Sequence, residues 1–469
     1  MINFPTRLYV IDPHIYVERD THGRLLTMVT EDSDTENKYK QADAAETSPG
    51  GRSPVGRRRF LQAAGAGAAV GLAGCSGGGG GDGGPVTLGA AHILSGFASL
   101  YGEEAERGIE FAVSEINDNG GIDGRDVEVL TRDTEASGDT AIQQIRSLVQ
   151  EDNVDGLFGL DSSGVAQAVA PQISQLQMPF MITHAATPFV TSPQGEHEDS
   201  VGNEYVFRDS NSLAQDIYGA ARVAENLDAT EWATIGPDYA FGYETWDYFQ
   251  AYCDGLGVDA EFTAEQFPAL ATSDYRPFIS SILDADPDAV LTPLWGADLT
   301  TFIGQAESAG WFDQIDHTLF SVGMGTDLPS DGSPLPEGEY ASTRYDPFVP
   351  DTETNNSFRE AYYEEYESLP TYNAEGAYRA VHLYKEAIES AGGTDPSALV
   401  DEFTGMEHSG PVGDYQFSET NQATVASIWG TVTYDDEWES NVLDPVNRYE
   451  AGPDVLSEAL GDSDLPTGI

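Results

Sequence analysis

A repeated alternation of short apolar runs and amphipathic segments constrains the fold of this chain more than any other feature. Apolar runs typical of buried strands lie at residues 86–91, 127–130, 154–159 and 179–183. Apolar residues recur at helical spacing between them, at residues 105–116, 141–149 and 165–176. Strand–helix–strand units in series predict a parallel sheet with helices on both faces.

The same alternation restarts after about residue 210. Strands are predicted at residues 232–236, 258–263, 289–294 and 318–322, and helices at 213–226, 242–256, 275–284 and 299–310. Helices at 357–368 and 375–391 and strands at 413–418 and 425–434 follow. About 390 residues follow residue 75, more than one hydrophobic core usually serves, so two domains are expected. We therefore predict an α/β chain of two doubly wound, Rossmann-like lobes.

The segment ahead of the first predicted strand has the features of an export signal. Arg57, Arg58 and the Phe60-Leu61 pair fit the Arg-Arg-x-Phe-Leu pattern of a twin-arginine signal. The uncharged run at 63–73 suits a signal h-region and is too short to span a bilayer. Residues 72–75 resemble a lipobox, in which Cys75 is lipidated after cleavage. We predict an exported protein, lipid-anchored on the outer face of the cell membrane.

The flanks of this signal are predicted to lack packed structure. Residues 1–56 form a poorly structured extension, residues 57–75 the signal, and residues 76–85 a glycine-rich tether. Met28 is an alternative start. A phosphate-binding loop is the other use of a glycine run, but a preceding strand and a Lys-Ser/Thr ending are missing.

The charge of the chain is strongly acidic. Residues 1–75 hold nine basic and nine acidic residues, so the rest keeps the formal net charge of −59, with Lys385 as its one lysine. Such a charge repels itself in dilute buffer, whereas in molar salt the Debye length falls to about 3 Å. We predict a halophilic protein. The lack of a basic patch excludes a nucleic-acid partner.

Catalytic, cofactor and metal motifs are not found. With Cys75 taken by the lipid, Cys253 is the one cysteine left, so no disulfide is expected within the chain, and its helical spacing predicts a buried side chain. No Gly-x-Ser-x-Gly elbow surrounds Ser163, and zinc-type Cys/His spacing is missing. The acidic run around His197 favours a solvated loop over a metal site, and His184 favours a structural role over ligand binding. We predict neither an enzyme nor a cofactor or metal.

Several segments carry a family resemblance. They are residues 93–102 (ILSGFASLYG), 108–125 (GIEFAVSEINDNGGIDGR), Asp133, 159–164 (GLDSSG) and 185–187 (AAT). The chain resembles the leucine/isoleucine/valine-binding branch of the type I periplasmic binding proteins, in the form of a haloarchaeal-type twin-arginine lipoprotein. The resemblance implies three crossings between the lobes, near residues 207–211, 339–347 and 418–424. The lobes would then comprise residues 86–207 with 345–420 and 208–344 with 421–450, followed by a tail at 451–469.

Physical reasoning and the resemblance together nominate a ligand site. Ser163 and Thr187 each follow a predicted strand and precede a helix, so they meet at the carboxyl edge of a parallel sheet. Hydroxyls and backbone N–H groups at helix N-termini suit a carboxylate or carbonyl oxygen, although both residues also suit simple capping. The resemblance adds the aromatic and backbone positions Tyr101, Ala185, Tyr239, Phe241, Trp295 and Tyr372; the aromatic ones equally suit a hydrophobic core.

One position departs from the family pattern. Amino-acid receptors of this family hold the ligand ammonium with an acidic residue after a second-lobe strand, and here that position aligns with Met324. Asp327 replaces it only if the loop shifts. An unpaired buried ammonium costs several kcal/mol. An amide, urea or a carboxylate is therefore at least as suitable a ligand as a branched-chain amino acid.

The resemblance implies a transport role. The lobes would close over a small solute, and the closed monomer would deliver it to an ABC permease driven by its ATPase. The alternative is a ligand-sensing module for a separate signalling receptor, because the same fold supports both uses.

Overall fold

The chain forms two separate structural units, Met1–Gly77 and Gly78–Ile469. The computed structural model describes residues 15–19, 25–29, 84–321 and 335–469 of them. In the first unit, β1 (Ile15–Arg19) pairs antiparallel with β2 (Leu25–Val29), although no strand was predicted there. The predicted signal residues Arg57 and Arg58 and the predicted lipidation site Cys75 lie outside the described residues.

The second unit begins with a parallel sheet in the order β4-β3-β5-β6-β7, a doubly wound arrangement. The strands are β3 (Val86–His92), β4 (Val127–Asp133), β5 (Gly156–Gly159), β6 (Phe180–Ile182) and β7 (Val206–Arg208). The connecting helices are η1 (Gly96–Ala98), α1 (Ser99–Asp118), α2 (Gly138–Gln150), α3 (Ser163–Leu176) and η2 (Pro188–Val190). We call this sheet and its helices the first lobe.

Alternate strand residues of the first lobe face two different helix layers. Leu88 and Phe158 belong to the core cluster that contains α1 and α10 (Tyr372–Ala391). Ala91 and Leu157 belong to the cluster that contains α2 and α3. Because both faces are covered, the inner strands β3, β5 and β6 are almost uniformly apolar, which is why the sequence revealed them, whereas the edge strand β4 also carries charged residues. Also in this lobe are α9 (Glu353–Tyr366), α11 (Pro396–Phe403) and the hairpin of β13 (Glu407–Gly410) and β14 (Gly413–Gln416).

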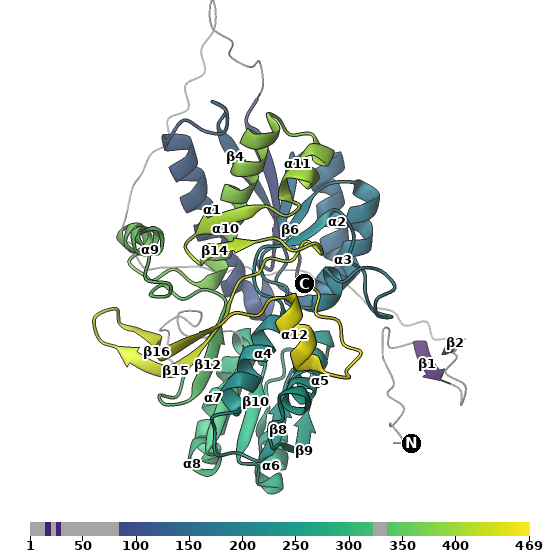
Figure 1. The fold of residues 1–469 in the computed structure, drawn as a ribbon, viewed down its shortest axis with the longest axis vertical. Helices are drawn as coiled ribbons and strands as arrows, with labels where there is room; N and C mark the ends of the chain where they lie inside the picture. Colours follow the sequence, from purple (N-terminus) through teal and green to yellow (C-terminus); the bar gives the residue numbers. More distant parts are fainter. Residues whose placement is uncertain (1–14, 20–24, 30–83, 322–334) are drawn as a thin grey trace, which may run out of the picture. The chain divides into compact units, whose positions relative to one another are not determined.

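A second sheet repeats the same strand order and extends it. Its order is β9-β8-β10-β11-β12-β15-β16, parallel up to β12 and antiparallel beyond. The strands are β8 (Glu231–Ile235), β9 (Glu261–Gln266), β10 (Ala289–Thr292), β11 (His317–Phe320), β12 (Tyr340–Thr343), β15 (Ser427–Asp435) and β16 (Ser440–Tyr449). The helices are α4 (Leu213–Ala224), α5 (Ala240–Leu256), α6 (Arg276–Ala285), α7 (Gly296–Ala309), α8 (Trp311–Gln314) and α12 (Pro453–Leu460). This is the second lobe, drawn below the first in Figure 1.

Three chain segments link the two lobes, the number that the resemblance implied: 209–212, 344–352 and 417–426. The second begins later than the expected 339–347, because residues 340–343 form β12 of the second sheet. The first and third are bonded to each other, because Gln422 Nε2 donates to the Ser210 carbonyl at 2.7 Å. Arg208, at the end of β7, adds a parallel bridge with Gln422, and its Nε donates to Gln422 Oε1 at 2.6 Å. The fold class predicted from the sequence, two doubly wound α/β lobes joined by three crossovers, is confirmed.

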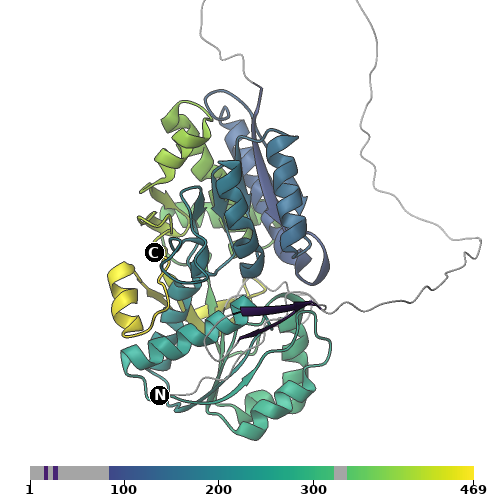
Figure 2. The same cartoon turned by 90° about the vertical axis from the view of Figure 1, so that its right-hand side faces the viewer.

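Two further contacts bridge the lobes beside the crossovers. Trp438, between β15 and β16, packs its ring against Tyr363 of α9, with 4.9 Å between ring centroids. In the same cluster Arg359 lies over the rings of Trp438 and Phe348. On the side seen in Figure 2, α12 packs on α5 and α4, and the chain beyond it runs to the first lobe, where Thr191 donates to the Gly468 carbonyl at 2.7 Å.

Several boundaries differ from prediction. The strand predicted at 258–263 is β9, three residues later, because this edge strand is largely exposed and carries little apolar pattern. The predicted strand at 413–418 belongs to a separate hairpin, and neither β16 nor α12 was predicted. Cys253 is buried, as predicted. Within the described ranges, no helix combines the length and apolar character needed to cross a membrane.

Candidate functional site

The carboxyl ends of both parallel sheets border one small cavity between the lobes. It has a volume of about 20 Å³ and is lined by Asp161, Ser163, Ala186, Tyr239, Phe241, Trp295, Arg344 and Tyr372. Ser163 opens α3 directly after β5, while Tyr239 and Trp295 are the N-cap residues of α5 and α7. This is the position at which doubly wound sheets bind ligands.

Most residues nominated from the sequence come together here. Ser163, Tyr239, Phe241, Trp295 and Tyr372 line the cavity. Tyr101 stands directly behind it, with its ring centroid 5.7 Å from that of Trp295 and 6.2 Å from that of Tyr372. The second lobe thus supplies three aromatic side chains and the first lobe two more, so a flat apolar ligand body would find aromatic walls on several sides.

The two predicted hydroxyls are engaged with the backbone. Ser163 Oγ accepts from the Thr187 N–H at 3.2 Å, which ties the two strand ends together. Thr187 caps η2 with Pro188 at its first position, as predicted, and its Oγ1 accepts from the Phe189 N–H. Thr187 therefore has a capping role in this arrangement, whereas Ser163 links two loops and also faces the cavity.

Other nominated residues lie elsewhere. Ala185 is fully buried, its N–H bonded to Leu160 and its carbonyl to Arg208, and its neighbour Ala186 lines the cavity instead. Met324 and the alternative Asp327 lie outside the described residues.

Direct hydrogen bonds close the lobes around this cavity. The Gly296 N–H at the start of α7 donates to the Tyr101 hydroxyl at 3.1 Å. Gln167 of α3 donates to Glu244 of α5 at 3.0 Å, and burial raises the pKa of Glu244 to about 8. The remaining cavity has room for about one water molecule. A larger solute therefore enters only when the lobes part.

Arg344 is the site residue that was missed. It follows β12 in the second crossover, lines the cavity and is 6% exposed. Its guanidinium donates to the His184 carbonyl and lies over the Tyr372 ring, 5.3 Å from the centroid. Among the described residues, its Nε has no hydrogen-bond partner, and the charge of Arg344 acts on the buried carboxyl of Asp216, whose pKa it lowers against the larger effect of burial. A buried cation without an anion is costly unless a ligand supplies one.

Asp161 is the second missed residue on the cavity. Its Oδ1 lies 3.0 Å from Nδ1 of both His92 and His184, and its Oδ2 accepts from the Ile93 N–H at 2.7 Å. Burial raises the pKa of Asp161, but the charge and hydrogen bonds of the two histidines outweigh it and hold that pKa well below the usual range. Burial lowers the pKa of His184 to about 4. Asp161 is therefore ionised and His184 neutral near pH 7.

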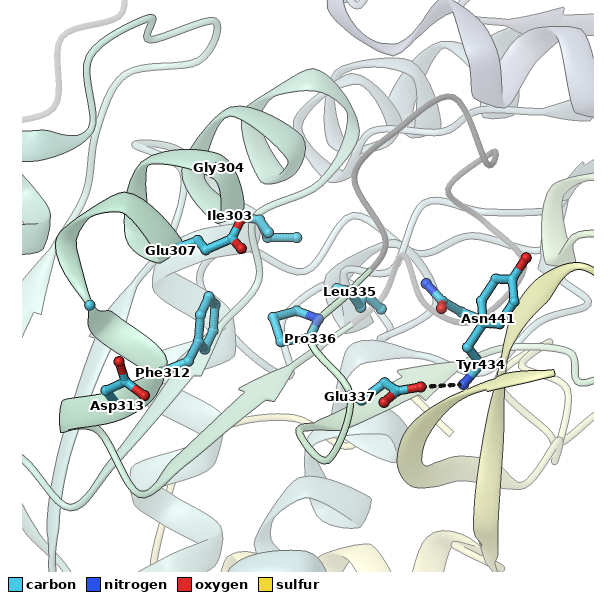
Figure 3. Close-up of a pocket in the computed structure, with 11 residues that line it drawn as sticks. Ile303, Gly304, Glu307, Phe312, Asp313, Leu335, Pro336, Glu337, Tyr434 and Asn441 are labelled. Atoms are coloured by element: carbon cyan, nitrogen blue, oxygen red, sulfur yellow. Dashed lines mark hydrogen bonds between the residues drawn. The ribbon is translucent and has the colours of Figure 1, made fainter. Parts of the chain in front are cut away.

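A larger hollow of about 750 Å³ lies in the second lobe, away from the strand ends. Figure 3 shows Glu307 and Phe312 from α7 and α8 on one side and Tyr434 and Asn441 from β15 and β16 on the other. None of the nominated residues lines it. Its rim at Leu335 adjoins a segment outside the described residues, so we assign no function to it.

Comparison with known proteins identifies relatives along most of the chain. The family model described as periplasmic binding protein matches residues 85–435. Leu/Ile/Val-binding protein homolog 7 of Brucella suis is 25% identical over 368 residues, covering 74% of this chain and 88% of the relative. Homolog 6 of the same organism is 28% identical over 360 residues, covering 73% and 86%.

Solved structures share the fold. A solute-binding protein of an ABC transporter from Rhodopseudomonas palustris BisB5, in complex with 3,4-dihydroxybenzoic acid, has a TM-score of 0.69 and 23% identity and covers 79% of this chain and 99% of its own. A leucine-binding protein from Thermotoga maritima has a TM-score of 0.65 and 20% identity, covering 77% and 98%. Both confirm two α/β lobes of the type predicted.

Proposed function

The chain belongs to the periplasmic binding protein family, and we propose that it is the substrate-binding protein of an ABC importer that captures a small aromatic carboxylate. The family comprises solute-binding proteins and not enzymes, in line with the prediction from the sequence. The assignment of lobes to residues 86–207 with 345–420 and 208–344 with 421–450 is part of this proposal.

The unpaired guanidinium of Arg344 carries the choice of ligand. It is buried at the cavity and forms no ion pair with a carboxylate of the described residues, although Asp161 lines the same cavity, so an anionic group on the solute could pair with it. Arg pairs with carboxylates through two parallel hydrogen bonds, which are among the stronger polar contacts in proteins. Nearby Ser163 adds a hydroxyl that can donate to the same group.

The aromatic walls favour a flat body attached to that carboxylate. Tyr239, Phe241, Trp295 and Tyr372 border the same space as Arg344. The relative from Rhodopseudomonas palustris BisB5 was solved with 3,4-dihydroxybenzoic acid, and another from that species with benzoate, which supports this ligand class here. A branched-chain amino acid would bring an ammonium into the same space as the Arg344 guanidinium, and among the described lining residues Asp161 is the carboxylate that could pair with it.

Capture would proceed by closure of the lobes. In the open form the solute would meet Arg344 and Ser163, and closure would bring Tyr239 and Trp295 over its ring. The hydrogen bonds Tyr101–Gly296 and Gln167–Glu244 would then hold the closed form. Exclusion of water strengthens the contact between the guanidinium and the carboxylate, because the local dielectric falls. A permease would recognise the closed surface.

The test is isothermal titration calorimetry of the chain in molar KCl with benzoate, 4-hydroxybenzoate, benzamide, urea and leucine. We expect the benzoates to bind and benzamide, which has the same shape without the charge, to bind at least tenfold more weakly. Arg344→Gln should weaken benzoate binding 10- to 100-fold (about 1.5–3 kcal/mol), whereas the exposed Arg276→Gln should not. Leucine binding that survives Arg344→Gln would overturn the ligand assignment.

The cellular location is a separate part of the proposal. The signal at Arg57 and Arg58 and the lipobox cysteine Cys75 indicate twin-arginine export followed by lipid anchoring. Cys75→Ser should release the exported protein from the membrane fraction into the medium, and Arg57→Lys with Arg58→Lys should retain the precursor inside the cell. Membrane association of the Cys75→Ser protein would contradict the lipid anchor.

A further inference from the structure

Three ionisable side chains from distant parts of the sequence converge at the carboxyl ends of the strands in the first sheet. His92 is the last residue of β3, Asp161 lies two residues beyond β5, and His184 lies two residues beyond β6. These strands are neighbours in the order β3-β5-β6 and run parallel. Their carboxyl ends therefore meet, and the three side chains meet with them.

The geometry of this cluster is that of a metal donor set. Nδ1 of each imidazole lies 3.0 Å from Asp161 Oδ1, and one ligand atom from each of the three residues lies within 4.8 Å of the others. The side chains are 0%, 2% and 1% exposed for His92, Asp161 and His184. The Ile93 N–H fixes the other carboxylate oxygen and so orients Oδ1 toward the rings.

Protein hydrogen bonds alone leave this cluster incomplete. His184 Nδ1 has two close oxygen neighbours, Asp161 Oδ1 and Thr183 Oγ1 at 2.8 Å, but carries at most one proton. Two imidazoles and a carboxylate are the ligands that zinc and related ions prefer, and three protein ligands leave a position open.

We propose that His92, Asp161 and His184 bind one divalent transition-metal ion of the zinc class. Mg²⁺ and Ca²⁺ take oxygen ligands and would not compete for two imidazoles. Asp161 also lines the ligand cavity, so the ion would lie against its floor and offer its open position to a solute oxygen. Only this last consequence rests on the proposed function; the site itself does not.

Metal binding is measured on the chain alone, without organic solute. The full chain is stripped with EDTA, dialysed and titrated with Co²⁺ and Zn²⁺. We expect one Zn²⁺ per chain by calorimetry, visible d–d absorption from a four-coordinate Co²⁺ site, and displacement of Co²⁺ by Zn²⁺ but not by Mg²⁺. A Co²⁺ spectrum no different from that of the hexa-aqua ion would overturn the proposal.

Variants locate the ion. Asp161→Asn keeps the shape of the side chain, and His92→Gln tests a second ligand in case the first variant fails to fold. Each should lower Zn²⁺ affinity at least 100-fold, since loss of even an outer partner costs about 10- to 100-fold. The matched control is His197→Gln, which removes a histidine beside the exposed Asp199 and should leave the affinity unchanged. Zn²⁺ binding that is lost in the control and kept in both variants would also overturn the proposal.

The two proposals fail separately. Absence of benzoate binding with intact Zn²⁺ binding would reject the carboxylate ligand and keep the metal site. Benzoate binding that is unaffected by EDTA, together with a Co²⁺ titration that shows no binding, would reject the metal site and keep the carboxylate ligand.

Discussion

Gln167 in the first lobe donates a hydrogen bond of 3.0 Å to Glu244 in the second, and the same amide lies 3.2 Å from the Thr187 hydroxyl. A carboxyl group buried by lobe closure is thereby connected to a strand end beside the ligand cavity. The second oxygen of Glu244 has no hydrogen-bond partner among the described residues. Burial therefore favours the neutral form of Glu244, so the contact between the lobes should depend on pH.

The free energy of unfolding should depend on the proton held by Glu244. Burial raises the pKa of Glu244 from 4.5 to about 8 in the folded chain. Its contribution is fully present below pH 4.5 and is lost as the pH rises through about 8, because the unfolded chain releases the proton first. The free energy of unfolding, obtained from thermal melts between pH 4.5 and 9, should decline as the pH rises. The decline should be smaller in Glu244→Gln, by a few kcal/mol at most. Equal slopes in the two proteins would contradict the assignment.

Removal of the Tyr101 hydroxyl should weaken solute binding. Tyr101→Phe leaves the Gly296 N–H of α7 without its acceptor in the closed form. A buried unpaired donor costs about 1–3 kcal/mol, so benzoate affinity should fall roughly 5- to 150-fold. The exposed Tyr434→Phe is the control and should bind as the original protein does. Calorimetry gives both values, and unchanged affinity in Tyr101→Phe would show that this bond does not hold the closed form.

The contact between Trp438 and α9 should stabilise the folded unit. Trp438→Ala removes a ring that packs on Tyr363 and on the Arg359 guanidinium. Aromatic and cation–π pairs of this kind contribute about 0.5–1.5 kcal/mol each beyond the area they bury. We expect a melting point several degrees lower with the circular dichroism spectrum unchanged. A melting point within one degree of the original would show that the contact of Trp438, between β15 and β16, with α9 adds nothing to stability.

Salt should be required for stability at neutral pH. The chain carries a formal net charge of −59, so the folded state repels itself unless counter-ions screen it. The melting point should rise steadily from 0.1 M to 3 M KCl, where the Debye length shrinks from about 10 Å to under 3 Å. A melting point independent of KCl would reject the halophilic interpretation.

The parts of the fold that could be predicted from the sequence are those with a local pattern of apolar residues. Both runs of strands and helices are visible because strands covered on both faces are uniformly apolar and their helices are amphipathic. Ser163 was nominated for a related reason, because it stands where a strand gives way to a helix and that transition can be recognised locally, whereas Tyr239 and Trp295 were nominated from the family resemblance. The edge strand β9 was displaced by three residues because only one neighbour covers it.

The charged part of the site could not be predicted, because it depends on which strands are neighbours. His92, Asp161 and His184 are ordinary residues in the sequence until β3, β5 and β6 are placed side by side. The available signal was their common position at or just after a strand end. Arg344 lies in a predicted crossover. The only hint that it belongs to the cavity was that basic residues are scarce in this chain.

Arg208 has a consequence for how such a receptor could be redesigned. Its buried guanidinium bonds Gln422 of the third crossover, the carbonyls of Ala185 and Thr187, and the Thr191 hydroxyl. Arg208 therefore holds the third crossover and the loop after β6 together. A substitution that reshapes this loop would also disturb the connection between the two lobes. Substitutions that aim to change ligand specificity would leave this connection intact if they were made in the second lobe, at Tyr239, Phe241 and Trp295.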